Sequence, residues 1–507
     1  MTLRYLLLKA SGFSLTLLLV VATVLAPGAR AEKLMRAAIP DLPPAGADPY
    51  YTTNVMTVLV LSALYDSLTT IDRGGNLQPA LATSWEATDE ITWIFRLRPG
   101  VKFSNGEDFN SSAVVTALDY LKGPDGAATG VGREVAQIES YRMLDDLTVE
   151  VKTIAPYPIL PRAFAALRVP APEYWKALGP QAFAQDPVGT GPFKVDAWAP
   201  GRISFSAFEG AWRSPKFDKY EILAVPEQTA RVQALVSGAV DIAMSISADD
   251  RGAVESAGAT MYEAVSAGNL VISFRTGMDT PLKNRNVRRA LNFAVNKQAM
   301  VDILMGGAGT VASQPVPPET LGFNLELEPY PYDPDRARQL LAQAGYSDGF
   351  EMTIEISGGD GSNTDAIYQM VASDLHQVGV AATLQVVPTQ TLVNQIFQGG
   401  WKGEAFSMTM DTLPTLDALR PFRLHSCLWV SPWHCNEADT PVIEEAQREL
   451  DLEKRNALVQ ELLRRYHDDP PALYLVQVVG FVGLGKRIRN YVSDYGVIHY
   501  YDLELIE

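Results

Sequence analysis

Two cysteines and two histidines lie close together near the C-terminal fifth of the chain and could form a disulfide or a metal site. His425 and His434 flank Cys427 and Cys435, so two thiols and two imidazoles fall within eleven residues. The spacing does not match common zinc patterns. In an oxidising compartment, closing so short a loop with a disulfide stabilises by about 2–3 kcal/mol. We therefore expect a disulfide and no bound metal, with the metal site as the alternative.

A second motif has the form of a hydrolase active site. Gly345-Tyr-Ser-Asp-Gly349 is a Gly-x-Ser-x-Gly sequence with Ser347 as its nucleophile. A nucleophile elbow follows a strand and precedes a helix, whereas here a predicted helix precedes the serine and a strand follows it. The motif is better explained as a helix stop and turn. We expect no catalytic residue, and an exported serine hydrolase is the remote alternative.

The N-terminus has the pattern of a secretory signal peptide. Arg4 and Lys9 supply positive charge, residues 13–25 form an apolar core, and Ala29-Arg30-Ala31 is a small-x-small cleavage site. We expect residues 1–31 to be removed and the mature chain to begin at Glu32 in the periplasm. An uncleaved anchor helix is the alternative, although the apolar run is short for a membrane span.

The charge of the chain argues against several classes of partner. The formal net charge is −17, and residues 1–31 hold three basic and no acidic residues, so the remainder carries −20. Nucleic acids and anionic membrane surfaces require a basic face on the protein, so neither is an expected partner. Such a charge favours solubility.

Beyond the N-terminal segment, strands alternate with helices. Asp333-Pro334 is an N-cap followed by proline, and Gly345 closes the helix between them. Strand–helix–strand units build parallel or mixed sheets, so an α/β fold is expected. The predicted strands are 193–198, 240–244, 269–276, 351–356 and 380–387, and the predicted helices are 228–237, 287–295, 333–345, 367–378 and 441–466.

A glycine- and proline-rich run spans Asp186 to Asp196. Gly189 and Gly191 bracket Thr190, and Pro187 and Pro192 bracket the glycines. We expect a rigid turn in which the glycines adopt positive φ and the prolines fix their own φ.

In their order, these features resemble the peptide/nickel group of periplasmic solute-binding proteins that serve ABC transporters. The resemblance covers essentially the whole mature chain and includes the cysteine pair. The segments that carry it are Leu64-Tyr-Asp-Ser-Leu-Thr69, Leu77-Gln-Pro-Ala-Leu-Ala-Thr-Ser-Trp-Glu86, Trp93-Ile-Phe-Arg-Leu-Arg-Pro-Gly-Val-Lys-Phe-Ser-Asn-Gly106, Val188-Gly-Thr-Gly-Pro-Phe193, Pro281-Leu-Lys-Asn-Arg-Asn-Val-Arg-Arg-Ala-Leu291 and Tyr332-Asp-Pro-Asp-Arg-Ala-Arg-Gln-Leu-Leu-Ala-Gln-Ala-Gly-Tyr346.

The resemblance implies two α/β lobes joined by a hinge, with an extra domain inserted in the first lobe. On this chain it implies that the first lobe comprises residues 32–73, 188–275 and 478–507. The inserted domain would be 74–187 and the second lobe 276–477. Residues 269–276 would form one of the strands that cross the hinge.

The resemblance also implies a ligand anchor, because peptide binders of this group hold the ligand's ammonium with a carboxylate on the second lobe. Asp411 falls at that position, with Met410 beside it. Ser407 and Met408 stand where the group often has Gly-Trp, so the pocket wall differs. In the hinge strand, Arg275 replaces the usual Asn and could grip a carboxylate. A zwitterion held between Asp411 and Arg275 is the favoured arrangement, and a structural salt bridge is the alternative for Arg275.

Other residues are weaker candidates for the pocket lining. The loop 357–363, where dipeptide binders can carry a cationic anchor, contains no Arg or Lys. Arg133, Tyr50 and Trp401 are candidates because aromatic and cationic side chains suit such clefts.

The resemblance therefore predicts a binding protein and no enzyme. It would capture a short peptide or a peptide-like, amine-bearing solute such as an opine, close around it and deliver it to the permease subunits of an ABC importer. No cofactor is expected, and a monomer is expected. The alternative within the same fold is a metal chelate, haem or a sugar as cargo.

Overall fold

The computed structural model describes residues 32–357 and 364–506. The predicted signal peptide and residues 358–363 of the candidate loop lie outside these ranges. Every element below belongs to one unit, residues 33–507. Within the described ranges, no helix is both long enough and apolar enough to cross a membrane.

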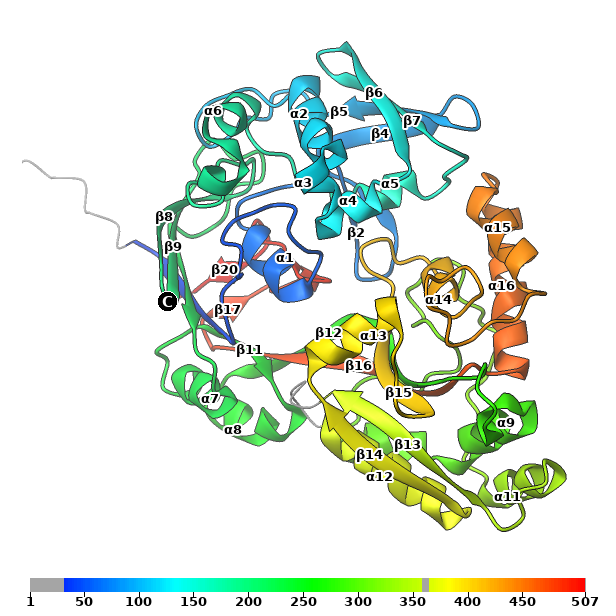
Figure 1. Cartoon of the computed structure of the whole chain (residues 1–507). Helices are drawn as coiled ribbons and strands as arrows, with labels where there is room; N and C mark the ends of the chain where they lie inside the picture. Colours follow the sequence, from blue (N-terminus) through cyan, green and yellow to red (C-terminus); the bar gives the residue numbers. More distant parts are fainter. Residues whose placement is uncertain (1–31, 358–363, 507) are drawn as a thin grey trace, which may run out of the picture. The chain divides into compact units, whose positions relative to one another are not determined.

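A ten-stranded mixed sheet forms the framework (Figure 1). The predicted strands 193–198, 240–244, 269–276, 351–356 and 380–387 all fall on strands of this sheet, but the strand predicted at 269–276 begins nine residues earlier, at Thr260. The order is β14 (Val380–Val387), β13 (Phe350–Ser357), β15 (Ala405–Asp411), β12 (Thr260–Phe274), β16 (Ala472–Leu484), β11 (Ile242–Ile246), β1 (Leu34–Ile39), β10 (Lys219–Ala224), β9 (Arg202–Ala207) and β8 (Phe193–Ala199).

Two long antiparallel strands, β12 and β16, join the two halves of this sheet. The first part of β12, from Thr260 to Val265, pairs with residues 479–484 of β16, which also pair with β11. After an irregular stretch, residues 268–274 of β12 pair with β15. Each strand therefore passes from one half to the other, and the irregular stretch of β12 between Val265 and Asn269 lies at the crossing.

Helices pack beside the two halves of the sheet. In α11, the Asp333 side chain accepts the Arg336 N–H at 2.8 Å, which confirms the predicted cap. The predicted helix 441–466 is two helices, because Asp451 caps a new start by accepting the N–H of Glu453 at 3.0 Å. The helices are α1 (Val55–Leu61), α7 (Gln228–Val236), α8 (Arg251–Ser256), α9 (Arg285–Ala294), α11 (Pro334–Gln343), α12 (Thr364–Gln377), α13 (Thr389–Gln398), α14 (Leu419–Leu424), α15 (Thr440–Arg448) and α16 (Leu452–Asp468).

A separate four-stranded antiparallel sheet lies within the segment predicted as the inserted domain. Its order is β4 (Ala82–Ala87), β5 (Thr92–Leu97), β7 (Thr148–Thr153) and β6 (Ile138–Asp145). It shares no strand with the large sheet in the described residues, and it appears in cyan and blue in Figure 1. The helices of this segment are α2 (Ser111–Lys122), α3 (Pro124–Ala127), α4 (Gly130–Glu134), α5 (Leu160–Ala163) and α6 (Pro172–Phe183).

The glycines of the 186–196 run serve a different purpose from the one predicted. Neither Gly189 nor Gly191 has positive φ. A Cβ on Gly189 would lie 2.0 Å from the Leu64 carbonyl oxygen, and one on Gly191 would lie 2.8 Å from that of Ala63. The glycines are therefore needed for close backbone approach, which the Gly191 N–H uses to donate to Leu64 O at 2.9 Å.

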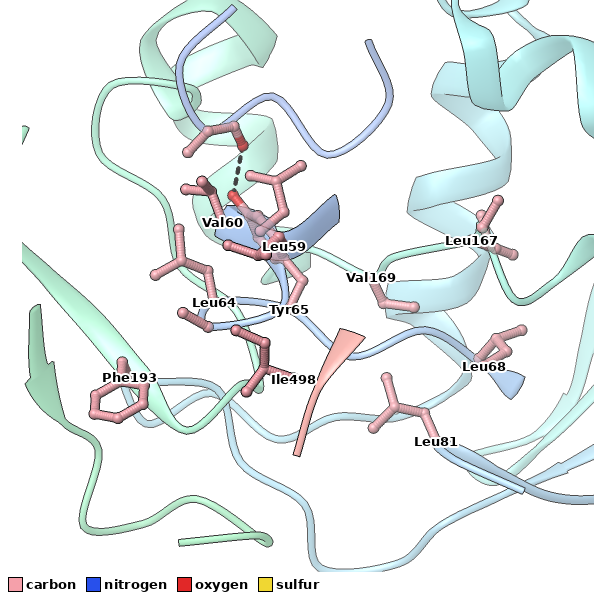
Figure 2. Packing of buried hydrophobic residues seen from close by; sticks show 14 of the residues in the cluster. Leu59, Val60, Leu64, Tyr65, Leu68, Leu81, Leu167, Val169, Phe193 and Ile498 are labelled. Carbon is pink, nitrogen blue, oxygen red and sulfur yellow. Dashed lines mark hydrogen bonds between the residues drawn. The ribbon is translucent and has the colours of Figure 1, made fainter. Parts of the chain in front are cut away.

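A large hydrophobic cluster supports the segment that carries Arg168. Leu167 and Val169 are fully buried in it, near Leu68 and Leu81 (Figure 2). The segment is extended and Arg168 bridges antiparallel to Ser67. Since successive side chains of an extended segment point to opposite sides, the Arg168 side chain leaves the segment on the side opposite to Leu167 and Val169.

A candidate ligand-binding site between the two lobes

Asp411 lies at the end of β15, where the strand leaves the sheet. Its side chain is exposed, whereas Met410 is fully buried in a cluster with Val271 and Tyr474. Asp411 Oδ1 accepts the N–H of Leu413 at 2.9 Å. Of the two predicted neighbours at this position, Asp411 is available to a ligand and Met410 is a core residue.

The Asp411 carboxylate is largely desolvated and has charged neighbours. Desolvation by the surrounding protein raises its pKa, although solvent still reaches the side chain. The Leu413 N–H and the positive charge of Arg420 lower that pKa, and the negative charge of Glu134 raises it. A cationic group from a ligand would relieve this desolvation by pairing with the carboxylate.

An ion pair next to Asp411 connects the inserted domain to the second lobe. Arg420 Nη1 on α14 lies 2.9 Å from Glu134 Oε2 on α4. Burial lowers the pKa of Arg420, but the charge and hydrogen bond of Glu134 outweigh it, and the net shift is upward. The three charges therefore form a row, Asp411, Arg420 and Glu134, that spans the two parts.

A second link between the same parts is made by Arg162 of α5. Its guanidinium donates to the carbonyls of Thr415 and Leu416, and at 2.9 Å to that of Gly75. Burial lowers the pKa of Arg162 to about 10. Arg162 thus ties the inserted domain to the loop that follows Asp411.

A cavity of about 50 Å³ lies between this loop and the first lobe. Its lining comes from the first lobe, the inserted domain, the loop after Asp411 and the C-terminal segment. The residues are Thr53, Val58, Thr70, Ile71, Ala165, Ala166, Arg168, Leu413, Pro414, Leu416, Asp494, Tyr495 and Val497.

The structure does not bring Arg275 and Asp411 together. Gly268 of β12 pairs with Asp411, and Phe274 pairs with Ala405 at the other end of β15. Along β12, six residues separate Arg275 from the position opposite Asp411, a distance of about 20 Å. A short zwitterion therefore cannot reach both residues, and the favoured arrangement from the sequence is corrected here.

Arg275 is instead occupied by the chain itself. Its Nη1 donates to the carbonyls of Gly403 at 2.6 Å and Trp401 at 3.3 Å. Burial lowers its pKa, and the nearby carboxylates of Glu355 and Glu404 act against that shift. The contacts are those of a residue that fixes the segment before β15, so neither the predicted ligand role nor an interlobe salt bridge is seen.

The remaining predicted lining residues are scattered. Tyr50 is fully buried against Tyr120 and Trp175. Trp401 stacks on Phe406 with 3.7 Å between ring centroids. Arg133 is exposed on α4, next to Glu134 of the charge row, and is the one of these three that lies beside the site described above.

The cysteine–histidine cluster is a disulfide with two buried histidines. Cys427 and Cys435 are bonded, as expected. His425 Nε2 lies 2.9 Å from Ser273 Oγ, and His434 Nδ1 lies 2.9 Å from Thr276 Oγ1. No cluster of possible metal ligands occurs among residues 32–357 and 364–506.

Four residues of the site were missed in the sequence: Glu134, Arg162, Arg168 and Arg420. Arg168 had a detectable signal, because it is the single charged residue within the apolar run from Ala163 to Pro172. The other three have no local signal, since their partners are distant in the chain.

The sequence matches the family model of the bacterial extracellular solute-binding proteins, family 5, over residues 76–426. It is 28% identical over 478 residues to heme-binding protein A of Haemophilus influenzae, with 87% of each chain covered. It is 27% identical over 489 residues to the glutathione-binding protein GsiB of Pectobacterium atrosepticum, covering 91% of this chain and 92% of that one.

Solved structures show the same fold at lower sequence identity. HbpA2 from Haemophilus parasuis superposes with a TM-score of 0.81 at 22% identity, covering 94% of this chain and 100% of that chain. Helicobacter pylori DppA, solved with the peptide STSA, gives 0.76 at 21% identity, covering 94% and 99%. The expected two-lobed α/β fold with an inserted domain is thereby confirmed. The chain belongs to the bacterial extracellular solute-binding proteins of family 5.

Proposed function

We propose that this protein is the periplasmic substrate-binding component of an ABC importer and that its cargo is a short peptide or peptide-like solute with a free amino group. Asp411 is the anchor for that amino group. The protein closes on the solute and presents the closed form to the permease subunits. It carries out no bond chemistry, because its task is to bind and release.

The observation that supports this proposal is the state of Asp411. It is a desolvated carboxylate that solvent can still reach, two residues before Leu413 of the cavity lining, with Arg420 as a neighbouring positive charge that is already paired with Glu134. A ligand ammonium is the group that such a carboxylate lacks. Charge-assisted hydrogen bonds of this kind contribute about 1.5–3 kcal/mol.

Glutathione is the first compound to test. Several relatives are named for it, and it is a tripeptide with one free amino group and two carboxylates. The alternative cargo, a metal chelate or haem, is suggested by the relative named heme-binding protein A. In this chain, His425 and His434 are buried against hydroxyl groups and offer such a cargo no ligand.

The test compares two matched pools of tri- and tetrapeptides, with free and with acetylated amino ends, and adds glutathione. Bound compounds are released by denaturation and quantified by mass spectrometry. The wild type should retain the free-amine pool at least tenfold better, and Asp411→Asn should lose that preference. Asp335→Ala, an exposed carboxylate paired with Arg338 on α11, is the control and should behave as the wild type. Equal retention of both pools by the wild type would refute the amine anchor.

A further inference from the structure

Arg168 is a buried cation without a carboxylate partner. It is 5% exposed, and its Nη1 donates to the Pro49 carbonyl at 3.0 Å. It forms no ion pair with any residue in the described parts of the chain. Guanidinium has five N–H donors, so most of its donor capacity is unused by the protein.

The nearest negative charge does not satisfy Arg168. Asp48 acts on it electrostatically, but the Asp48 Oδ1 atom accepts the N–H of Tyr50 at 2.8 Å instead. Burial raises the pKa of Asp48. Burial lowers the pKa of Arg168 to about 10, as expected for a desolvated cation that lacks a close anion.

Arg162 shows what a purely structural arginine looks like in the same region. It is similarly buried, at 7% exposed, yet its guanidinium is held by three backbone carbonyls. Arg168, six residues later, has one such contact. Since an unpaired buried charge is costly, a protein that retains one in this position has a use for it.

Arg168 also lines the interlobe cavity, together with Leu413 and Pro414, which follow Asp411 in the same loop. Asp494, which lines the same cavity, contacts His499 Nε2 at 2.8 Å and accepts the N–H of Arg73 at 3.1 Å, and it forms no ion pair with Arg168 in the described residues.

We propose that Arg168 binds a carboxylate of the cargo in this cavity, while Asp411 binds its amino group. The inference rests on the proposed function and specifies it further: the cargo carries a carboxylate as well as an amino group, and a residue of the segment predicted as the inserted domain binds that carboxylate. Arg168 thus takes the role that the sequence suggested for Arg275. The carboxylate could be the C-terminus of a peptide or an acidic side chain.

The experiment uses two further peptide pools, one with free C-terminal carboxylates and one with C-terminal amides, both without acidic side chains, and glutathione as a separate probe. The wild type should retain the free acids at least tenfold better than the amides. Arg168→Met should reduce that preference to within about twofold and should weaken glutathione retention by at least tenfold. If the wild type retains glutathione but does not distinguish acids from amides, the carboxylate that Arg168 binds is the α-carboxylate of the γ-linked glutamyl residue, and Arg168→Met must then abolish glutathione retention.

Two arginine variants serve as comparisons. Arg231→Met is the matched control, because Arg231 is 3% exposed and its guanidinium donates to carbonyls such as Met244 O at 2.8 Å. Arg275→Met tests the rival position from the sequence. Both should keep the preference for free acids. The proposal would be overturned if Arg275→Met lost the preference for free acids while Arg168→Met kept it.

A crystal structure of the wild type with the best-retained free acid tests the role of Arg168 even if Arg168→Met does not fold. The ligand carboxylate should lie within hydrogen-bond distance of the Arg168 guanidinium, and a carboxylate bound elsewhere would overturn the proposal. Failure of the proposed function itself has a different signature, because the wild type would then retain none of the pools and no glutathione.

Discussion

Arg420 of α14 pairs with Glu134 of α4 at 2.9 Å, and the same guanidinium acts on the carboxylate of Asp411. One arginine thus neighbours both the proposed anchor Asp411 and Glu134 of α4. Under the proposed function, this arrangement couples ligand binding to closure, because any group that pairs with Asp411 leaves Arg420 to Glu134.

Glu134→Gln should therefore weaken binding and closure together. Without its partner, Arg420 turns to Asp411 and competes with the ligand's amino group. We expect the affinity for the best-retained peptide to fall by about three- to tenfold, measured by calorimetry, and the ligand-induced decrease in radius of gyration to shrink, measured by X-ray scattering. Glu150→Gln, which breaks the exposed pair with Arg142 inside the four-stranded sheet, should change neither.

Binding should depend on pH through Asp411. Desolvation raises its pKa, so the carboxylate becomes protonated at a higher pH than an ordinary aspartate. Affinity for a free-amine peptide should be constant near pH 7.5 and should decline as the pH falls toward that raised pKa. Asp411→Asn should bind weakly with no such decline. A decline of the same size in Asp411→Asn would place the titrating group elsewhere.

Acid should destabilise the second lobe through its two buried histidines. Burial lowers the pKa of His425 to about 3 and that of His434 to about 4. In the unfolded chain both would titrate near 6.5, so their stabilising contribution is complete above about pH 6.5 and is lost as the pH falls toward 4. In that window each histidine lowers the free energy of unfolding by about 1.4 kcal/mol for every unit that the pH falls.

Urea unfolding at several pH values between 7 and 4.5 checks the histidine slope. His425→Gln should reduce the slope of unfolding free energy against pH by about half. His376→Gln, an exposed histidine of α12, should leave it unchanged and is the matched control. An unaltered slope in His425→Gln would show that other groups cause the acid sensitivity.

Gly189→Ala should destabilise the first lobe. Its Cβ would lie 2.0 Å from the Leu64 carbonyl oxygen, so the turn must move away from residues 63–64. The expected cost in unfolding free energy is about 2–3 kcal/mol, measured by urea denaturation. Gly277→Ala has open space around the added methyl and should stay within about 0.5 kcal/mol. Equal effects of the two substitutions would contradict the close-approach explanation.

The elements with local signals were predictable from the sequence. Asp333 and Pro334 marked the start of α11 because an N-cap and its hydrogen bond lie within four residues. The division between α15 and α16 was missed because Asp451 stands in a run of charged residues that also suits a continuous helix. The length of β12 was missed for a similar reason, since its first half is less apolar than its second.

The arrangement of the candidate site was not predictable to the same degree. Asp411 was found because the segment around it resembles those of known binding proteins. The separation of Asp411 from Arg275 depends on the register between β12 and β15, which no local pattern reveals. The position of Arg168 next to Leu413 and Pro414 joins segments more than two hundred residues apart.

The two strands shared by both halves of the large sheet have a mechanical consequence. Strand pairing between β12 and β16 continues on either side of the irregular stretch at residues 266–268. The two halves of the sheet can therefore separate by twisting of these two strands, without breaking the backbone hydrogen bonds between them. The free-energy difference between the closed and open forms therefore comes from side-chain contacts such as those of Arg162. A protein built in this way can be returned to its receptive form by exchanging a few polar contacts for water, with its framework intact throughout.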